Sequence, residues 1–215
     1  MSTASPVLSP KERRRAEDLA RRRRDAIQAA AGVFAEKGFH DAQMTEIAAR
    51  AELSRATLYA LFEGKDELYA EVVATTARGV RDSVRAQVAE IEDPGERLLG
   101  VIDALFACFE ASQDLLRIYT RATHGLSFRI RQELGDESFR VFEEFGDWVT
   151  ELAEAAGRSG RLEGLDPRAL ATALIGSVTL TATRWIEATP ALPLSQATQA
   201  VRPLFQRLLG DVPCV

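Results

Sequence analysis

Side chains suited to nucleic-acid recognition are concentrated in residues 45–71. Arg55 can make bidentate hydrogen bonds to guanine, and the methyl group of Ala56 can contact thymine. Thr57 and Tyr59 offer hydroxyl groups to phosphate oxygens, which position a protein on the duplex without reading its sequence. The spacing therefore predicts contact with double-stranded DNA. The candidate DNA-binding residues are Thr45, Ser54, Arg55, Ala56, Thr57, Tyr59 and Lys65.

Two short helices joined by a tight turn are expected to position these groups. Thr45 is predicted to cap the first helix and Ser54 the second, because a hydroxyl at a helix start accepts from an unpaired amide. At the start of the following helix, Lys65 would add a full positive charge to a helix end that favours phosphate. The predicted inner seam consists of Ile47, Ala48, Leu53, Leu58 and Phe62. This layout predicts a helix-turn-helix, whose second helix enters the major groove.

The pattern T-x-I-A-x-x-A-x-x-S-x-x-T-L-Y-x-x-F-x-x-K resembles the DNA-binding motif of the TetR family of bacterial transcriptional repressors. The resemblance is close over residues 25–73 and implies the same DNA-contacting roles at the matching positions. Two positions depart from the family pattern. Glu52 replaces the usual turn glycine, and Leu61 replaces a frequent histidine. The alternative for Thr57 and Tyr59 is that they only pack the helical subdomain.

The charge distribution supports a DNA-facing end joined to an acidic body. The chain has 215 residues and a net charge of −5. Residues 1–24 nevertheless contain eight Lys or Arg against three acidic residues, whereas residues 76–215 contain fifteen Arg against twenty. The run Arg21–Arg24 spans a full helical turn, so its side chains cannot all point the same way. Either some of them contact phosphates, or the run is simply a solvated face. The arm around Arg13–Arg15 is a candidate for minor-groove entry.

An all-α fold of about nine helices is expected, because helical periods separated by Gly and Pro recur and no strand pattern of useful length appears. Three segments are predicted: a basic N-terminal extension (1–20), a TetR-type helix-turn-helix domain (21–70) and a ligand-binding and dimerisation domain (71–215). Gly38 is expected to end the first long helix. Asp93-Pro94 and Asp166-Pro167 are expected to begin later ones, with proline in the first turn.

Aromatic residues crowd the middle of the chain. The candidate ligand-binding residues are Leu105, Phe106, Phe109, Tyr119, Phe128, Phe142, Phe145 and Trp148. From composition alone, aromatic residues at helical spacing are more often part of an ordinary hydrophobic core. The resemblance favours a ligand site, because TetR-type proteins usually hold an inducer in this domain. The nearby arginines are Arg117, Arg121, Arg129 and Arg131, which are either surface partners of acidic residues or the basic mouth of an apolar tunnel. The second interpretation is similar to family members that bind fatty acyl-coenzyme A.

The last two helices are the expected homodimer surface, since in TetR-type proteins they form a four-helix bundle with their two-fold mates. The candidate interface residues are Leu170, Ala173, Gly176, Ser177, Leu180, Arg184, Leu204 and Leu208. A helix that is apolar on more than one face must be covered by more than its own core. The alternative is a monomer in which this helix is fully internal.

Enzymatic chemistry has no positive signal. The two histidines lack ligand-spaced partners, and Gly64-Lys65 lacks the upstream glycine of a phosphate-binding loop. No cofactor or metal is expected. Two cysteines fit a cytoplasmic protein, and the uncharged run 169–183 is shorter than a bilayer span, so no membrane partner is expected. The predicted function is a ligand-responsive repressor that binds a near-palindromic operator; the alternatives are a helical enzyme or a non-regulatory DNA-binding or scaffold protein.

Overall fold

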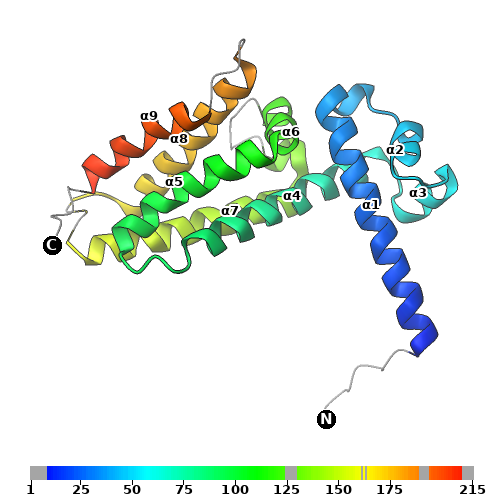
Figure 1. Ribbon diagram of the computed structural model, residues 1–215, viewed down its shortest axis with the longest axis horizontal. Helices are drawn as coiled ribbons and strands as arrows, with labels where there is room; N and C mark the ends of the chain where they lie inside the picture. The colour runs from blue at the N-terminus through cyan, green and yellow to red at the C-terminus, as the bar shows by residue number, and fades with distance from the viewer. Residues whose placement is uncertain (1–8, 124–129, 161, 163, 189–193, 210–215) are drawn as a thin grey trace. The chain divides into compact units, whose positions relative to one another are not determined.

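The regular structure of the described chain is entirely α-helical, as predicted. The computed structural model describes residues 9–123, 130–160, 162, 164–188 and 194–209. Within these ranges there are nine helices and no strand (Figure 1). The helices are α1 (Pro10–Asp41), α2 (Met44–Arg50), α3 (Arg55–Leu61), α4 (Lys65–Val88), α5 (Pro94–Ala111), α6 (Gln113–Thr123), α7 (Ile130–Arg158), α8 (Pro167–Glu187) and α9 (Leu194–Leu208).

The chain divides into two compact units, and the division falls inside α4 between Val72 and Val73. In the first unit, α1 contacts α2, and α2 contacts α3. The buried face of α1 carries small residues and Phe34, whose ring meets Tyr69 edge-on at 5.0 Å between centroids. Gly38 interrupts α1 with a φ of 79°, a conformation that favours glycine. The predicted break is therefore present, although three more residues continue beyond it as a helical turn.

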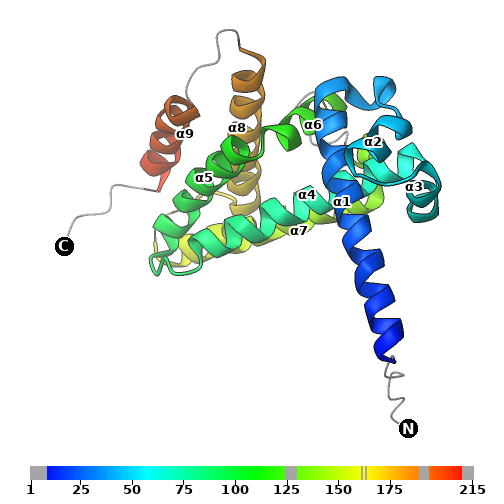
Figure 2. The ribbon, with the colours of Figure 1, turned by 45° about the vertical axis from the view of Figure 1, so that its right-hand side comes forward.

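The second unit is built around α5, which contacts α6, α7, α8 and α9. Its buried face joins residues of α4, α7, α8 and α9 in one apolar core. The helix starts follow the local sequence: Asp93 and Asp166 each accept a backbone N–H, at 2.8 and 2.7 Å, with proline next in the chain. Arg202 links α9 to α5 through Glu96 and Asp103, both at 3.0 Å. Figure 2 shows α8 and α9 beside α5, and all three helices contact one another.

Helix α8 combines an apolar composition with a face that is buried in the protomer. Among the described helices it is long and apolar enough to cross a membrane by length and composition, although its uncharged run 169–183 is shorter than a bilayer span. One face of α8 is buried in the core of the second unit, with Leu174, Val178 and Ala182 fully covered. The apolar character of this face therefore has a structural cause within the protomer itself.

Candidate DNA-binding surface and ligand pocket

The seam between α2 and α3 is apolar and closed. Ile47 and Ala48 of α2 and Leu58 of α3 are almost completely buried, and Phe62 closes the end of the pair. Between the helices, Glu52 has a φ of 55° and is the one non-glycine residue of the described chain in the left-handed region. That conformation explains why a glycine is usual at this position, because a Cβ atom is strained there.

Ser54 caps α3 as predicted. Its hydroxyl oxygen accepts from the backbone N–H of Thr57 at 3.0 Å, and the two hydroxyl oxygens are 2.8 Å apart. The prediction for Thr45 was wrong. Helix α2 begins at Met44 with Gln43 in the cap position, so Thr45 lies inside the first turn and its hydroxyl donates to Gln43 Oε1 at 3.4 Å. Thr45 remains exposed, which keeps its hydroxyl accessible.

The opposite face of α3 is open to solvent. Arg55 and Ala56 are exposed in the first turn, and Thr57 is half-buried. Tyr59 is 47% exposed, unusual for an aromatic side chain on a helix whose neighbours Leu58 and Leu61 are buried. The face predicted to meet DNA is thus uncovered, whereas Leu61, which departs from the family pattern, is part of the inner seam.

Lys65 has a structural role that the sequence did not reveal. Its ammonium group donates to the carbonyl oxygens of His40 and Ala42, at 3.0 and 3.2 Å, and lies 4.6 Å from the ring centroid of Phe39. These contacts connect the start of α4 to the end of α1 and the residue that follows it. An ammonium group has three N–H donors, so these two carbonyl oxygens leave one N–H unused.

The arginine run of α1 separates into two kinds of residue. Arg23 donates to the carbonyl oxygen of Leu61 at 2.7 Å, pairs with Glu71 at 3.3 Å and lies 4.3 Å above the Phe62 ring. It therefore holds α1 against the end of α3. Arg21, Arg22 and Arg24 are exposed, and the first two pair with Asp18. The hydrogen bond from Arg21 lowers the pKa of Asp18.

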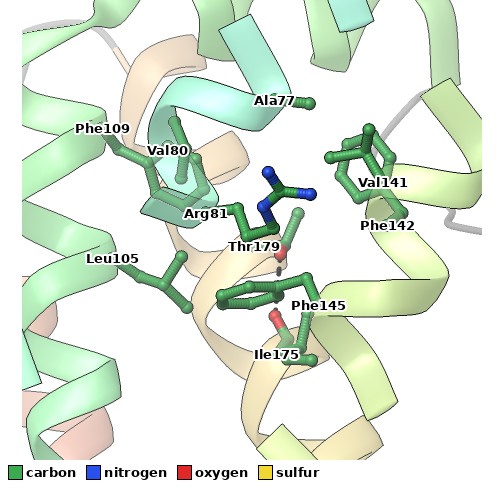
Figure 3. Close-up of a pocket in the computed structure, with 10 residues that line it drawn as sticks. All are labelled: Ala77, Val80, Arg81, Leu105, Phe109, Val141, Phe142, Phe145, Ile175 and Thr179. Atoms are coloured by element: carbon green, nitrogen blue, oxygen red, sulfur yellow. Dashed lines mark hydrogen bonds between the residues drawn. The ribbon is translucent and has the colours of Figure 1, made fainter. Parts of the chain in front are cut away.

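A pocket lies in the second unit, among α4, α5, α7 and α8. It contains about 560 Å³ of empty space, including the part that opens to solvent. Figure 3 shows Leu105 and Phe109 of α5 facing Phe142 and Phe145 of α7 across it. These four are among the predicted ligand-binding residues. The others that line it are Ala77, Val80, Arg81, Val141, Ile175 and Thr179.

The remaining predicted ligand residues do not line this pocket or cannot be placed. Phe106 is 2% exposed and belongs to the core cluster, so it does not line this pocket. Trp148 packs beside Phe145, at 5.6 Å between centroids, and under Arg85 at 5.1 Å, without lining the pocket. The Tyr119 side chain and Phe128 lie outside the described residues, as do the side chains of Arg121, Arg129 and Arg131; Arg117 is exposed.

Two side chains bring polarity to the pocket. Thr179 donates its hydroxyl hydrogen to the carbonyl oxygen of Ile175 at 2.7 Å, within its own helix. Arg81 donates from Nε to Asp82 at 2.9 Å and from one terminal nitrogen to Glu144 of α7 at 2.7 Å. The hydrogen bond to Asp82 raises the pKa of Arg81 and lowers that of Asp82, so both groups are charged over the physiological range.

Comparison with known proteins agrees with this geometry. Residues 26–72 match the family model of bacterial regulatory proteins of the tetR family, which spans α2, α3 and parts of the flanking helices. The HTH-type transcriptional activator FasR of Mycolicibacterium smegmatis is 36% identical over 89 residues, or 41% of each chain. Residues 26–72 belong to the TetR family. In this match, α3 corresponds to the second helix of the family's helix-turn-helix motif.

Solved structures extend this TetR fold over the whole chain. The fatty acid degradation regulator FadR from Bacillus halodurans has a TM-score of 0.72 at 23% identity, covering 98% of this chain and 100% of that one. FadR from Bacillus subtilis, solved in complex with stearoyl-CoA, has a TM-score of 0.72 at 21% identity, covering 87% and 98%. At such identities the likeness concerns the fold. The chain spans about half the length, 51% and 41%, of two curated relatives that it matches.

The outer faces of α8 and α9 are exposed and largely apolar in the protomer. Ala173, Gly176, Leu180 and Arg184 are exposed along one side of α8, and Leu204 and Leu208 are exposed on α9. Ser177 is half-buried. Leu170 instead packs into the core of its own protomer, unlike the other predicted interface residues of α8.

Proposed function

We propose that this TetR-family regulator is a cytoplasmic homodimeric repressor that releases its operator when an apolar or acyl-chain effector binds. The observation that carries the proposal is the exposed face of α3. Tyr59 is 47% exposed while Leu58, its neighbour, is completely buried, so the helix is held in place from one side and offers the other. A recognition helix has this arrangement because its outer side chains must reach the floor of a major groove.

On DNA, the first turn of α3 would read base edges. Arg55 suits guanine and Ala56 suits the methyl group of thymine. Thr57, Tyr59 and Thr45 would bond phosphates, and Lys65 would use the N–H that its contacts to two carbonyl oxygens leave over. A dimer would place two such helices in successive major grooves, about one helical turn apart, which fits a near-palindromic operator.

Dimerisation is proposed through the outer faces of α8 and α9. Leu180, Leu204 and Leu208 are each at least half exposed in the protomer. Their burial against a two-fold mate would remove apolar surface from water. Ala173 and Gly176 lie on the same side of α8 as Leu180, and their small size lets two helices approach closely.

The effector is proposed to enter the pocket between α4 and α7. Its lining is almost wholly apolar, which is typical of small-molecule sites. The relatives support an acyl compound as the first candidate, because the B. subtilis FadR structure contains stearoyl-CoA. An effector of this kind would tilt α4 and move the two DNA-binding units apart. It must bind the two states unequally, with a coupling of roughly 1–3 kcal/mol.

Fluorescence anisotropy on duplexes that tile the DNA upstream of the gene tests this proposal. Each titration is run with and without a long-chain acyl-CoA, at fixed salt because phosphate contacts make affinity salt-dependent. The expected result is tight binding to one duplex and release by the ligand. Tight binding that ignores the ligand would contradict the acyl effector and retain the DNA-binding regulator.

Two other outcomes would favour the alternative functions. Uniform, weak and salt-sensitive binding to every duplex would contradict operator recognition and favour a DNA-compacting protein. No binding at any salt concentration would favour a scaffold or a helical enzyme. Arg55→Ala supplies the internal control, since loss of a guanine contact should reduce binding mainly at operators that present guanine there, by about 1–3 kcal/mol.

A further inference from the structure

Arg81 is the one charged side chain among the residues that line the pocket in the described chain. In Figure 3 its guanidinium group extends toward Val141 and Phe142, between the walls of the cavity. The surrounding side chains are aliphatic or aromatic, apart from Thr179, whose hydroxyl hydrogen is already donated to Ile175. Arg81 is therefore the one charged group that the described chain places beside the cavity, and while it is paired with Asp82 and Glu144 it presents almost no polar surface to it.

The present partners of Arg81 lie mostly in water. Its side chain is 19% exposed, whereas those of Asp82 and Glu144 are 63% and 59% exposed. Asp82 holds Nε and Glu144 holds one terminal nitrogen; the other terminal nitrogen has no hydrogen-bond partner among the described residues. A guanidinium group with a free edge can take a carboxylate in the paired geometry that this fork favours.

We propose that the pocket selects amphipathic carboxylates, whose apolar body fills the cavity and whose carboxylate replaces Glu144 on Arg81. The ligand class stands on the pocket geometry, and its regulatory consequence rests on the proposed function. The exchange is favourable because Glu144 returns to solvent at little cost, since its side chain is already 59% exposed in the pair. The ligand carboxylate, held at an apolar wall, gains a charge-assisted bond while its chain leaves water.

The same exchange provides a link from the pocket to α4. Within the second unit, bridges of long side chains join α4 to α7, among them Arg78 to Glu137 at 2.9 Å and Arg81 to Glu144 at 2.7 Å. Of these two, the second involves a residue that lines the pocket and the first does not. A bound carboxylate would break the Arg81 bridge and leave the Arg78 bridge intact, which loosens α4 at the pocket. A neutral ligand would leave both bridges in place.

Isothermal titration calorimetry on the full-length protein without DNA tests the ligand class. The probes are dodecanoate, 1-dodecanol and dodecanoyl-CoA, all below their aggregation concentrations. Dodecanoate is expected to bind about tenfold or more tightly than dodecanol, because a hydrogen bond to a charged group is among the stronger ones. Equal affinities for the two would overturn the proposal, and so would binding of dodecanoyl-CoA alone. The wild-type comparison requires no variant to fold.

Variants of the two bridges supply the matched control. Arg81→Gln should lower the affinity for dodecanoate about tenfold and leave the affinity for dodecanol unchanged. Glu144→Gln should raise the affinity for dodecanoate a few fold, because it removes the carboxylate that competes for Arg81. Arg78→Gln and Glu137→Gln should leave both affinities within about twofold, since their bridge does not line the pocket. The proposal would be contradicted if Arg81→Gln lowered the affinities for both ligands equally, or if Glu137→Gln raised the affinity for dodecanoate.

Failure of this inference is distinguishable from failure of the proposed function. Ligand affinity is measured in the absence of DNA, and operator release is measured separately by anisotropy. If dodecanoate binds through Arg81 without changing operator affinity, the ligand class holds and the effector-controlled release is refuted. If the operator is released by a ligand that binds independently of Arg81, the function holds and the carboxylate site is refuted.

Discussion

Replacing Glu52 by glycine should stabilise the DNA-binding unit, because this residue adopts a left-handed backbone in the turn between α2 and α3. Its φ is 55°, and its side chain is exposed, so no buried contact is lost on truncation. The left-handed conformation costs an L-residue about 1–2 kcal/mol. Glycine relieves that strain but also adds freedom to the unfolded chain, worth about 0.4–1 kcal/mol. The expected net gain is about 0.5–1 kcal/mol.

The gain is best measured where it arises. Because the chain forms two compact units, a single global transition is not assured, so amide hydrogen exchange in α2 and α3 is the direct assay. Glu52→Asn and Glu52→Gln are the matched controls. Asparagine tolerates the left-handed region and should recover part of the gain, whereas glutamine keeps the strain and removes only the charge.

The same variants separate backbone strain from electrostatics on DNA. For a phosphate about 10 Å away in solvent, repulsion by the Glu52 carboxylate is about 0.4 kcal/mol, or about twofold in affinity. Glu52→Gln should therefore bind DNA about twofold tighter at low salt, with no gain in stability. If glutamine stabilises the unit as much as glycine does, the strain argument is refuted. If neither variant changes exchange protection, the turn is not strained by its side chain.

Three further changes test other parts of the molecule. Leu180→Glu should raise the dimer dissociation constant about thirtyfold or more in sedimentation velocity, because burying the exposed half of this leucine contributes roughly 1 kcal/mol per protomer. Leu19→Glu is the control, since Leu19 is similarly exposed but lies on α1, and it should leave the dissociation constant unchanged. Tyr59→Phe should weaken anisotropy binding to all duplexes about equally, and a loss confined to one operator would contradict its phosphate role. Gly79→Ala, in α4 with open space where the added methyl group would point, should raise the free energy of opening of α4 by about 0.5–1 kcal/mol in amide hydrogen exchange; a decrease would contradict the helical environment.

Most helix boundaries could be predicted because their signals are local. Asp93 and Asp166 cap the helices that follow them, and Ser54 caps α3, each through a backbone N–H three residues away. Thr45 failed as a cap for a tertiary reason. Met44 is buried and belongs to α2, so the helix begins before the threonine can cap it. The observed cap, Gln43, lies two residues before the one that the hydroxyl pattern favoured.

The candidate sites were predicted unevenly. The outer face of α3 follows from helical period alone, because buried Leu58 and Leu61 leave Arg55 and Tyr59 on the other side. Aromatic crowding indicated a pocket region, but it could not separate Phe106, which is core, from Phe142, which lines the cavity. Both types bury apolar area, so their sequence signals are the same.

The sequence by itself determined the helical architecture and the exposed face of α3, because caps, prolines and apolar periods act over a few residues. Tertiary structure decided the roles of the basic side chains. Arg23 bonds a carbonyl oxygen 38 positions away, Lys65 one 25 positions away, and Arg81 a carboxylate 63 positions away. A long, flexible cation carries no local signal of its partner, since its charge is satisfied by whatever acceptor the packed helices bring within reach.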